Sequence, residues 1–471
     1  MSKLNNDILY YMFQELNEVD ENSLFTCLLV NKLWCKLIIP ILWRCPMKHW
    51  FYKIKRKKLL FKTIILHLSE NSRKLLKNNH INIKKQKLSF NYISYCKYIG
   101  MYKIFPYVFN SKSRLNDSQI MLLRQEIYKL FISECSNIKY LDSPELCFPL
   151  YQFPGANLCL TSLCELDCRT DHDPSILEGL AQICRSIEKI HIILAGGINH
   201  GLMCNYGLIK LIEMQKQIKY IKLMDYLNTT ECRCESFSQA LEKQAHSILY
   251  LNLQMMSFSH FIFSSFINLE ALILFNKYEK LDDEKHPVVT TYPKLQILEL
   301  HQIPLNMATK IIQNTDGNLW KIKIRTSNFY YSREYIQSIH KYCPYVKYAS
   351  VFINNQNLDE LENLLINCQH LEAIDIIKMD GYFDIVKFLN LLIKFAPTIL
   401  YKIHISLKIF TINSLNLLAE NWKGRKTLHL YDHDSNWFEE IEKYKFEGVV
   451  GHNNCVDFWN VDNYSAIQWN C

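Results

Sequence analysis

Glycine and proline are scarce in this chain of 471 residues, with twelve of each. This scarcity excludes collagen-like and low-complexity disordered chains, and it argues against an all-β fold built on many tight turns. Long apolar runs are lacking too. The most apolar stretch, 257–275, is interrupted by His260, Asn268 and Glu270, so no membrane span is expected. Polar residues also interrupt the first segment, and no secretory signal is expected.

A large charge of one sign is also missing. The formal net charge is +8, which is small for this length, and we treat the basic residues as mostly dispersed. We therefore expect no nucleic-acid partner. Because neither a membrane span nor a secretory signal is expected, we also expect no membrane partner and a cytoplasmic or nuclear location. The basic run 53–58 is either a solvated linker face or a nuclear address. The 17 cysteines are expected to be free thiols, as in a reducing compartment.

The first fifty residues predict three short helices. Apolar residues recur at helical spacing from Leu4 to Leu16, and two further apolar segments run from Leu24 to Trp34 and from Leu37 to Trp43. Helices this short cannot bury all of this surface among themselves. Part of it is therefore expected to face a partner.

The order of these residues resembles the F-box motif. That family opens with leucine and proline, an acidic residue, Ile-Leu, Ile/Met-Phe and leucine. It then has a Val-Cys-Lys-x-Trp element and a closing Leu-Trp. Here Asn5 stands where the family usually has proline, Val30-Asn31-Lys32-Leu33-Trp34 forms the central element, and Leu42-Trp43-Arg44-Cys45-Pro46 is typical of large fungal F-box families. The matching opening residues are Leu4, Asp7, Ile8, Leu9, Met12, Phe13 and Leu16.

F-box proteins dock to a Skp-type adaptor of a cullin-based ubiquitin ligase, and the resemblance implies the same partners here. The alternative is a helical cap over the rest of the chain, which would not need the ordered central and closing elements. The residues that the resemblance divides between the domain interior and the adaptor interface are Leu4, Ile8, Leu9, Phe13, Leu24, Val30, Trp34 and Trp43.

The rest of the chain repeats a set of three apolar positions: a lead residue and the positions three and five residues after it. The sets recur about every 26 residues, as in leucine-rich repeats. The second and third positions fall on one side of an expected strand, and amphipathic stretches such as 358–365 predict helices between strands. One such unit cannot cover its own apolar face, so the units should stack into a solenoid with a parallel sheet.

Ten sets are clear, and they are flanked by the degenerate sets Ile138/Leu141 and Leu428/Leu430. The clear sets are Leu163/Leu166/Cys168, Ile187/Ile190/Ile192, Ile218/Ile221/Leu223, Ile248/Leu251/Leu253, Leu269/Leu272/Leu274, Leu295/Leu298/Leu300, Leu319/Ile322/Ile324, Val346/Ala349/Val351, Leu371/Ile374/Ile376 and Leu400/Ile403/Ile405.

Cysteine supports this register. Cys135, Cys184, Cys343 and Cys368 each stand three residues before a lead, where we expect a small buried residue at a helix end. This spacing resembles the cysteine-containing leucine-rich repeats found behind F-boxes.

The register also predicts which residues line the other side of the strands, two, four and six positions after each lead. On that face we expect a basic strip of Lys321, Lys323 and Arg325 beside the aromatic residues Tyr348 and Phe352. Such a strip suits a partner segment that is acidic and has an apolar anchor. The alternative is that these side chains are only solvated, or are covered by the C-terminal residues.

Catalytic and metal-binding signatures are not recognisable in the sequence. The triplets 171–173 and 432–434 combine aspartate and histidine, but adjacent residues do not converge on one ion. Cys232-Arg233-Cys234 lacks the second pair that a zinc site needs. We therefore expect no enzyme activity, no metal and no cofactor.

These observations predict an α/β protein with a right-handed leucine-rich-repeat solenoid behind a small all-helical F-box. The expected function is the recognition of a protein substrate for a cullin-type ubiquitin ligase. The alternative is a repeat scaffold that acts outside a ligase. The expected domains are 1–46 for the F-box, 47–134 for a connecting and capping helical segment, 135–440 for the solenoid and 441–471 for a C-terminal cap or tail.

Overall fold

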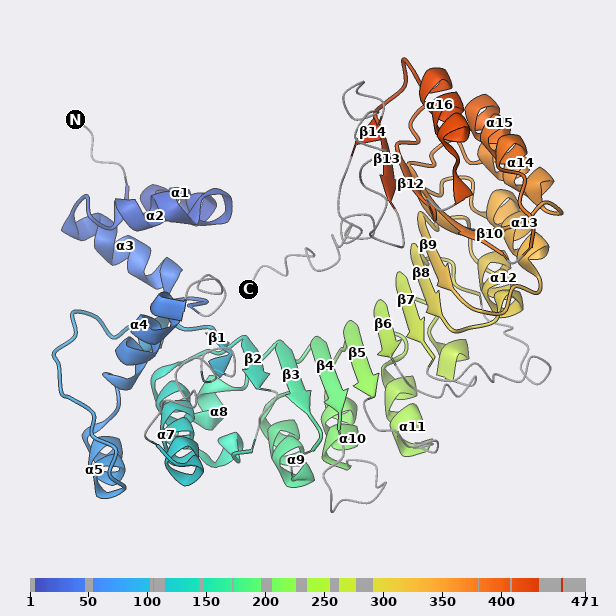
Figure 1. Cartoon of the computed structure of the whole chain (residues 1–471). Helices are drawn as coiled ribbons and strands as arrows, with labels where there is room; N and C mark the ends of the chain where they lie inside the picture. Colours follow the sequence, from blue (N-terminus) through green and yellow to red (C-terminus); the bar gives the residue numbers. More distant parts are fainter. Residues whose placement is uncertain are drawn as a thin grey trace. The chain divides into compact units, whose positions relative to one another are not determined.

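The chain divides into two compact units, one ending at Ile218 and the other beginning at Lys219 (Figure 1). No helix within the described ranges combines the length and hydropathy needed to cross a membrane. The computed structural model describes residues 5–46, 54–101, 105, 115–143, 147–171, 173–195, 206–225, 235–254, 262–276, 291–379, 381–406, 409–431 and 450–451.

The first unit begins with three short helices whose starts are fixed by side-chain caps. Asn5, Asp20 and Asn31 occupy the N-caps, and each side chain accepts hydrogen bonds from backbone N–H groups of the first turn. Asn5, which replaces the proline of the F-box pattern, therefore starts the first helix itself. Pro40 lies inside the last turn of the third helix without ending it. The helices are α1 (Asn6–Val19), α2 (Glu21–Cys27) and α3 (Lys32–Leu42).

The first strand of the repeat series lies earlier than the sequence predicts. β1 (Tyr98–Ile99) falls within 47–134, the segment expected to be a helical connection, and pairs in parallel with β2 (Tyr140–Ser143). The lead of this repeat is Cys96, and it is fully buried together with Ile99 and Met101. Because this lead is a cysteine, a search for aliphatic leads misses the repeat. The other elements of the segment are α4 (Ile54–Ile65), α5 (Glu70–Asn78), η1 (Ile93–Tyr95) and α7 (Asp117–Glu134).

The first unit continues as a series of strand, loop and helix. Its strands follow the order β1-β2-β3-β4, and the pairs β1–β2, β2–β3 and β3–β4 are parallel. Helices α8, α9 and α10 lie along one side of the strands (Figure 1). The remaining elements are η3 (Leu150–Gln152), α8 (Ala156–Cys159), β3 (Glu165–Arg169), α9 (Pro174–Ile183), β4 (Lys189–Leu194) and α10 (Tyr206–Glu213).

The second unit repeats the same pattern. Its strands follow the order β5 to β14, and each neighbouring pair is parallel. The elements are β5 (Tyr220–Asp225), α11 (Glu235–Gln244), β6 (Tyr250–Gln254), η4 (Ile262–Ser265), β7 (Ala271–Phe275), β8 (Ile297–His301), α12 (Leu305–Gln313), β9 (Lys321–Arg325), α13 (Ser332–Tyr342), β10 (Tyr348–Ile353), α14 (Leu358–Asn367), β11 (Ala373–Lys378), α15 (Ile385–Phe395), β12 (Lys402–His404), α16 (Ile412–Asn421), β13 (Leu428–Tyr431) and β14 (Val450–Gly451).

The predicted repeat register is confirmed. None of the thirty side chains in the ten clear sets is more than 2% exposed. Equivalent positions face each other across the strands: Leu298 pairs with Leu272 on one side and with Ile322 on the other. The α/β class and the parallel sheet are therefore observed as expected. Most of the C-terminal segment 441–471 lies outside the described residues.

The cysteines before the leads form hydrogen bonds as well as filling space. The Sγ atom of Cys135 lies 3.1 Å from the carbonyl oxygen of Ile93, and that of Cys184 lies 3.4 Å from the carbonyl of Leu160. Each bond joins the same position of successive repeats. Gln215 occupies this position one repeat later, and its Nε2 donates to the carbonyl oxygen of Cys184 at 2.9 Å. The position therefore selects a buried donor that reaches back to the preceding repeat.

The register predicts a large difference between buried and outward strand positions. Leu298→Ala should lower the free energy of unfolding by about 2–5 kcal/mol, because it opens a cavity in a fully buried site. Lys222→Ala, at a half-buried outward position of β5, should change it by no more than about 0.5 kcal/mol. Urea unfolding followed by circular dichroism measures both. Equal losses would contradict the assigned register.

Candidate functional site

The N-terminal helices divide the residues of the F-box resemblance into buried and exposed groups. Leu9, Phe13 and Leu24 are buried between the helices, and the Trp34 ring packs edge-on against Phe13 with centroids 5.0 Å apart. Trp43 is also buried, but it packs against Tyr92, with ring centroids 4.7 Å apart. Trp43 thus joins these helices to the following segment. Leu4 lies outside the described residues.

Two groups of apolar side chains on these helices remain exposed. Ile8 and Met12 lie one turn apart on α1, where the exposed Tyr11 adds to the same face. Leu29 and Val30 form the turn between α2 and α3 and are 88% and 58% exposed. Apolar surface of this kind on so small a module marks a place where another chain can bind.

The outward face of the second unit does not present the free basic strip that the sequence predicts. Lys321 is buried, at 3% exposure, and its Nζ lies 2.8 Å from Oε1 of Glu299 on the neighbouring strand. Lys323 Nζ lies 3.8 Å from the other oxygen of Glu299. Burial alone would raise the pKa of the Glu299 carboxyl, but Lys321 and Lys323 outweigh it and hold that pKa below its ordinary value.

Arg325, the third basic residue, belongs to a separate ionic group. Its guanidinium forms an ion pair with the fully buried carboxylate of Asp375, and His404 Nδ1 lies 2.7 Å from the other oxygen of that carboxylate. Burial alone would raise the pKa of Asp375, but the hydrogen bond with His404 and the charge of Arg325 hold it below its ordinary value. The strip is therefore a set of strand-to-strand ion pairs.

The prediction that Tyr348 and Phe352 are exposed beside this strip was wrong. Tyr348 is 6% exposed, and Phe352 is fully buried against Tyr335 and Phe329. Phe329 and Tyr335 belong to the loop and the helix that follow β9, and their rings cover Phe352. The Ser350 hydroxyl accepts a hydrogen bond from the Ile324 N–H at 2.7 Å and donates to the Ile324 carbonyl at 3.2 Å, while β10 stays paired with β11 through Ile353.

Sequence reasoning missed the acidic and histidine residues that complete these groups. Glu299, Asp375 and His404 each stand four residues after a lead, so the same register rule places them on the outward face. Reading every repeat at that position would have found them. His301, two residues after Glu299, stacks on Phe275 with ring centroids 4.9 Å apart.

A different surface of the second unit carries exposed aromatic residues. The loops that follow β9 and β11 present Tyr330 and Tyr382, which are 79% and 83% exposed. The adjacent Tyr331 is also exposed and has a φ of 66°, a left-handed conformation that is unfavourable for a large side chain.

Amide side chains from the loop between them hold these loops together. Asn355 Nδ2 donates to the carbonyl oxygen of Tyr382 at 3.2 Å, and its Oδ1 accepts from the Asp384 N–H at 2.9 Å. Asn357 Nδ2 donates to Ser332 Oγ at 3.3 Å. The exposed tyrosines are therefore displayed from fixed loops, which lowers the conformational entropy lost on binding.

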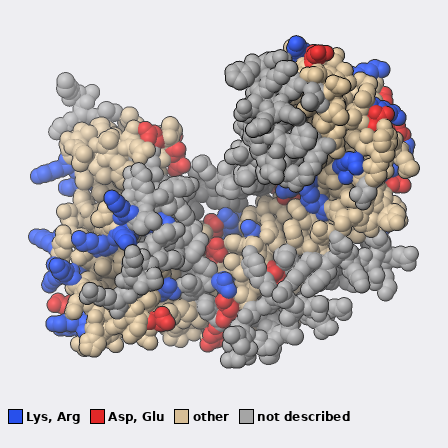
Figure 2. All heavy atoms as spheres, viewed as in Figure 1, with Lys and Arg blue, Asp and Glu red and all other residues tan. Residues whose placement is uncertain are grey.

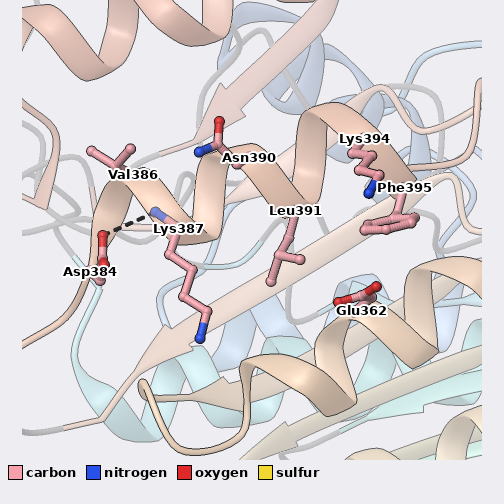
Figure 3. A pocket seen from close by; sticks show the side chains of 8 residues that line it. All are labelled: Glu362, Asp384, Val386, Lys387, Asn390, Leu391, Lys394 and Phe395. Atoms are coloured by element: carbon pink, nitrogen blue, oxygen red, sulfur yellow. Dashed lines mark hydrogen bonds between the residues drawn. The ribbon is translucent and has the colours of Figure 1, made fainter.

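A hollow of about 490 Å³ lies on the helical side of the same unit, over α14 and α15 (Figure 3). Glu362 and Lys387 lie in it, and Asp384 caps α15 through the Lys387 N–H at 3.0 Å. Lys394 lies over the Phe395 ring. The lining holds no serine, cysteine or histidine and so offers no nucleophile paired with a base.

The aspartate–histidine triplets of the sequence do not form a metal site in the part of the chain that the structure describes. Asp171 is paired with Arg169, and Asp173 caps α9. His172 and the triplet 432–434 lie outside the described residues. Elsewhere in the described ranges, no group of three potential metal ligands is found.

No family model and no curated protein matches the chain. Among the solved structures that match is the leucine-rich repeat-containing protein LegL7 from Legionella pneumophila, at 14% identity and a TM-score of 0.35. The match covers 61% of this chain and 90% of that one. The fold is assigned from the buried leads and the parallel register described above. The chain carries a leucine-rich-repeat fold.

The two kinds of ion pair should differ in their contribution to stability. Asp375→Ala leaves Arg325 and His404 without their buried carboxylate and should lower the free energy of unfolding by about 3–5 kcal/mol. Asp359→Ala removes an exposed pair with Arg333 and should cost less than about 1 kcal/mol. Urea unfolding at pH 7 measures both. Similar small losses would mean that the Asp375 group is not formed.

His301 should make stability depend on pH. Burial and the charge of Lys323 lower its pKa from 6.5 to about 4, so folding favours the neutral ring. The contribution of the neutral ring to the free energy of unfolding is fully present above pH 6.5. It is lost as the pH falls from 6.5 towards 4, because the unfolded chain then binds a proton that the folded chain does not. His301→Phe keeps the stacking on Phe275 and should flatten that part of the profile. Thermal unfolding midpoints measured from pH 4 to 8 test this, and parallel profiles would contradict it.

Proposed function

We propose that the N-terminal helices are an F-box that docks to a Skp-type adaptor of a cullin-based ubiquitin ligase, and that the repeats bind the protein to be ubiquitylated. The observation that supports adaptor docking is the exposure of Ile8, Met12, Leu29 and Val30 on helices that already bury Leu9, Phe13 and Leu24. Transfer of one such exposed side chain into a partner's groove contributes roughly 1.5–3 kcal/mol. Several together can support a stable complex.

The exposed and buried groups call for different tests. Leu29→Asp combined with Val30→Asp places charge on the proposed interface without touching the interior. We expect co-purification of the adaptor and cullin from cells to fall at least tenfold, with the thermal unfolding midpoint unchanged, because a carboxylate buried at an interface costs several kcal/mol. Phe13→Asp is less informative, since Phe13 is buried and the helices themselves should unfold.

The matched control is Leu158→Asp. Leu158 is 76% exposed on α8, far from the N-terminal helices in the sequence. Its substitution also replaces an exposed leucine with a carboxylate. It should leave adaptor co-purification intact. If the double variant retains the adaptor as well as Leu158→Asp does, the F-box assignment is wrong.

For the repeats, we propose that the substrate contacts the loop surface of Tyr330 and Tyr382. Exposed tyrosines on fixed loops supply large contact area at low entropy cost. The burial of Phe352 and the pairing of Lys321 remove two residues of the strand face that the sequence suggested. Lys323 and Arg325 are half-buried and paired with the carboxylates of Glu299 and Asp375. We therefore expect them to contact a substrate only at the edge of its binding surface.

Tyr330→Ser combined with Tyr382→Ser should remove a specific partner other than the adaptor from the co-purifying proteins, identified by mass spectrometry. Tyr345→Ser is the matched control, because Tyr345 is 64% exposed but precedes β10 and so stands at the other end of the strands. A partner lost equally in the control variant would place the contact elsewhere.

The alternative function is a leucine-rich-repeat scaffold that binds proteins without a ligase. The adaptor experiment separates the two: a scaffold would retain the partner of the tyrosine loops and would bring down neither adaptor nor cullin.

A further inference from the structure

The positive charge of the chain is concentrated in one segment. Residues 54–87 contain eleven lysines and arginines and one carboxylate, Glu70. Since the formal charge of the whole chain is +8, the remainder carries a small net negative charge. The premise of dispersed charge, from which we expected no nucleic-acid partner, therefore does not hold for this segment.

The exposed lysines of α4, α5 and the segment 81–88 are here called the lysine surface. Lys and Arg side chains gather over α4 and α5 on the face seen in Figure 2. Lys57 is the exception, because it is buried. The exposed lysines of the surface are Lys55, Lys58, Lys62, Lys74, Lys77, Lys84, Lys85 and Lys87.

The surface is hollowed between α5 and the segment that follows it. The hollow, of about 320 Å³, is lined by three lysines, one carboxylate, two amide side chains and two apolar residues: Lys74, Lys77, Lys85, Glu70, Asn82, Gln86, Leu68 and Ile83. The cations outnumber the single carboxylate. Arg73 lines it too and shapes it, because its guanidinium donates hydrogen bonds to the carbonyl oxygens at the turn between α4 and α5. A concave site with several cations and neutral donors suits phosphate groups.

The helices keep most of their apolar surface for the protein interior. Leu60, Ile64 and Leu76 are fully or almost fully buried, and the exposed Leu59 and Leu75 belong to different helices. An amphipathic helix that binds a membrane needs a continuous apolar face to insert. The lysine surface lacks such a face and offers charge and hydrogen-bond donors instead.

We propose that the lysine surface binds the sugar–phosphate backbone of a nucleic acid without reading its sequence. Lysines act as point charges that pair with phosphates, and amides donate to phosphate and sugar oxygens. A nucleic-acid strand carries one charge about every 3.4 Å. One strand can therefore bring several phosphates to lysines of the two helices and the loop. Binding of this kind releases counterions and is strongly dependent on salt.

The test is fluorescence anisotropy of the full chain with a labelled 20-nucleotide oligothymidine and a labelled 20-base-pair duplex, from 50 to 300 mM NaCl. The variant replaces Lys74, Lys77 and Lys85 with Ala. Each lost phosphate contact lowers the log–log salt slope by about 0.7–0.9, so we expect a fall of about two to three in slope. If the variant and the unaltered chain bind equally near 1 M salt, binding at 0.1 M should be weaker by roughly a hundredfold to five-hundredfold.

The control variant replaces Lys341, Lys387 and Lys423, three exposed lysines of the second unit, with Ala. It makes the same change in net charge and should leave affinity and slope unchanged. The variant Lys74→Arg, Lys77→Arg, Lys85→Arg should retain binding. Absence of binding by the unaltered chain, or equal loss in the control, would overturn the proposal. So would displacement of the probe by poly-glutamate or phosphatidylserine vesicles as effectively as by unlabelled nucleic acid at equal charge.

Discussion

Parallel strands that share one buried face must keep a common register, because a slip of one residue would turn every side chain to the other side. In this chain the constraint acts from repeat to repeat, and a strand such as β8 is held between two neighbours. Leu298 can be buried only while it lies between Leu272 and Ile322. The positions of the helices and of the loops follow from where each strand must begin and end.

The same register decides which residues meet on the outward side. Glu299 reaches Lys321 because positions on adjacent strands are brought opposite each other, although more than twenty residues separate them in the chain. Asp375 likewise joins Arg325 and His404 from different repeats. Buried ionic groups such as these add little to net stability over an apolar replacement, but breaking one partner is costly. They therefore favour this arrangement of repeats over others.

The sequence predicts best where one rule applies to every repeat. The leads and the residues three and five positions after them are buried as expected, because apolar spacing alone identifies these positions. It predicts poorly where a local contact overrides the rule. Cys96 replaces an aliphatic lead and hides the first repeat, and the rings of Phe329 and Tyr335 cover Phe352 on the face that the rule leaves exposed. Burial of Lys321 depends on its carboxylate neighbour, which no single repeat reveals.

The buried cysteines that precede the leads have a consequence for how the array opens. Burial raises the pKa of Cys184, Cys343 and Cys368 to about 12, so at neutral pH on the order of one thiol in 10⁵ is ionised. Alkylating reagents attack the thiolate, and each of these sulfurs is enclosed by its own repeat. Its rate of alkylation therefore measures how often that repeat opens, and the chain contains a set of natural reporters of local unfolding.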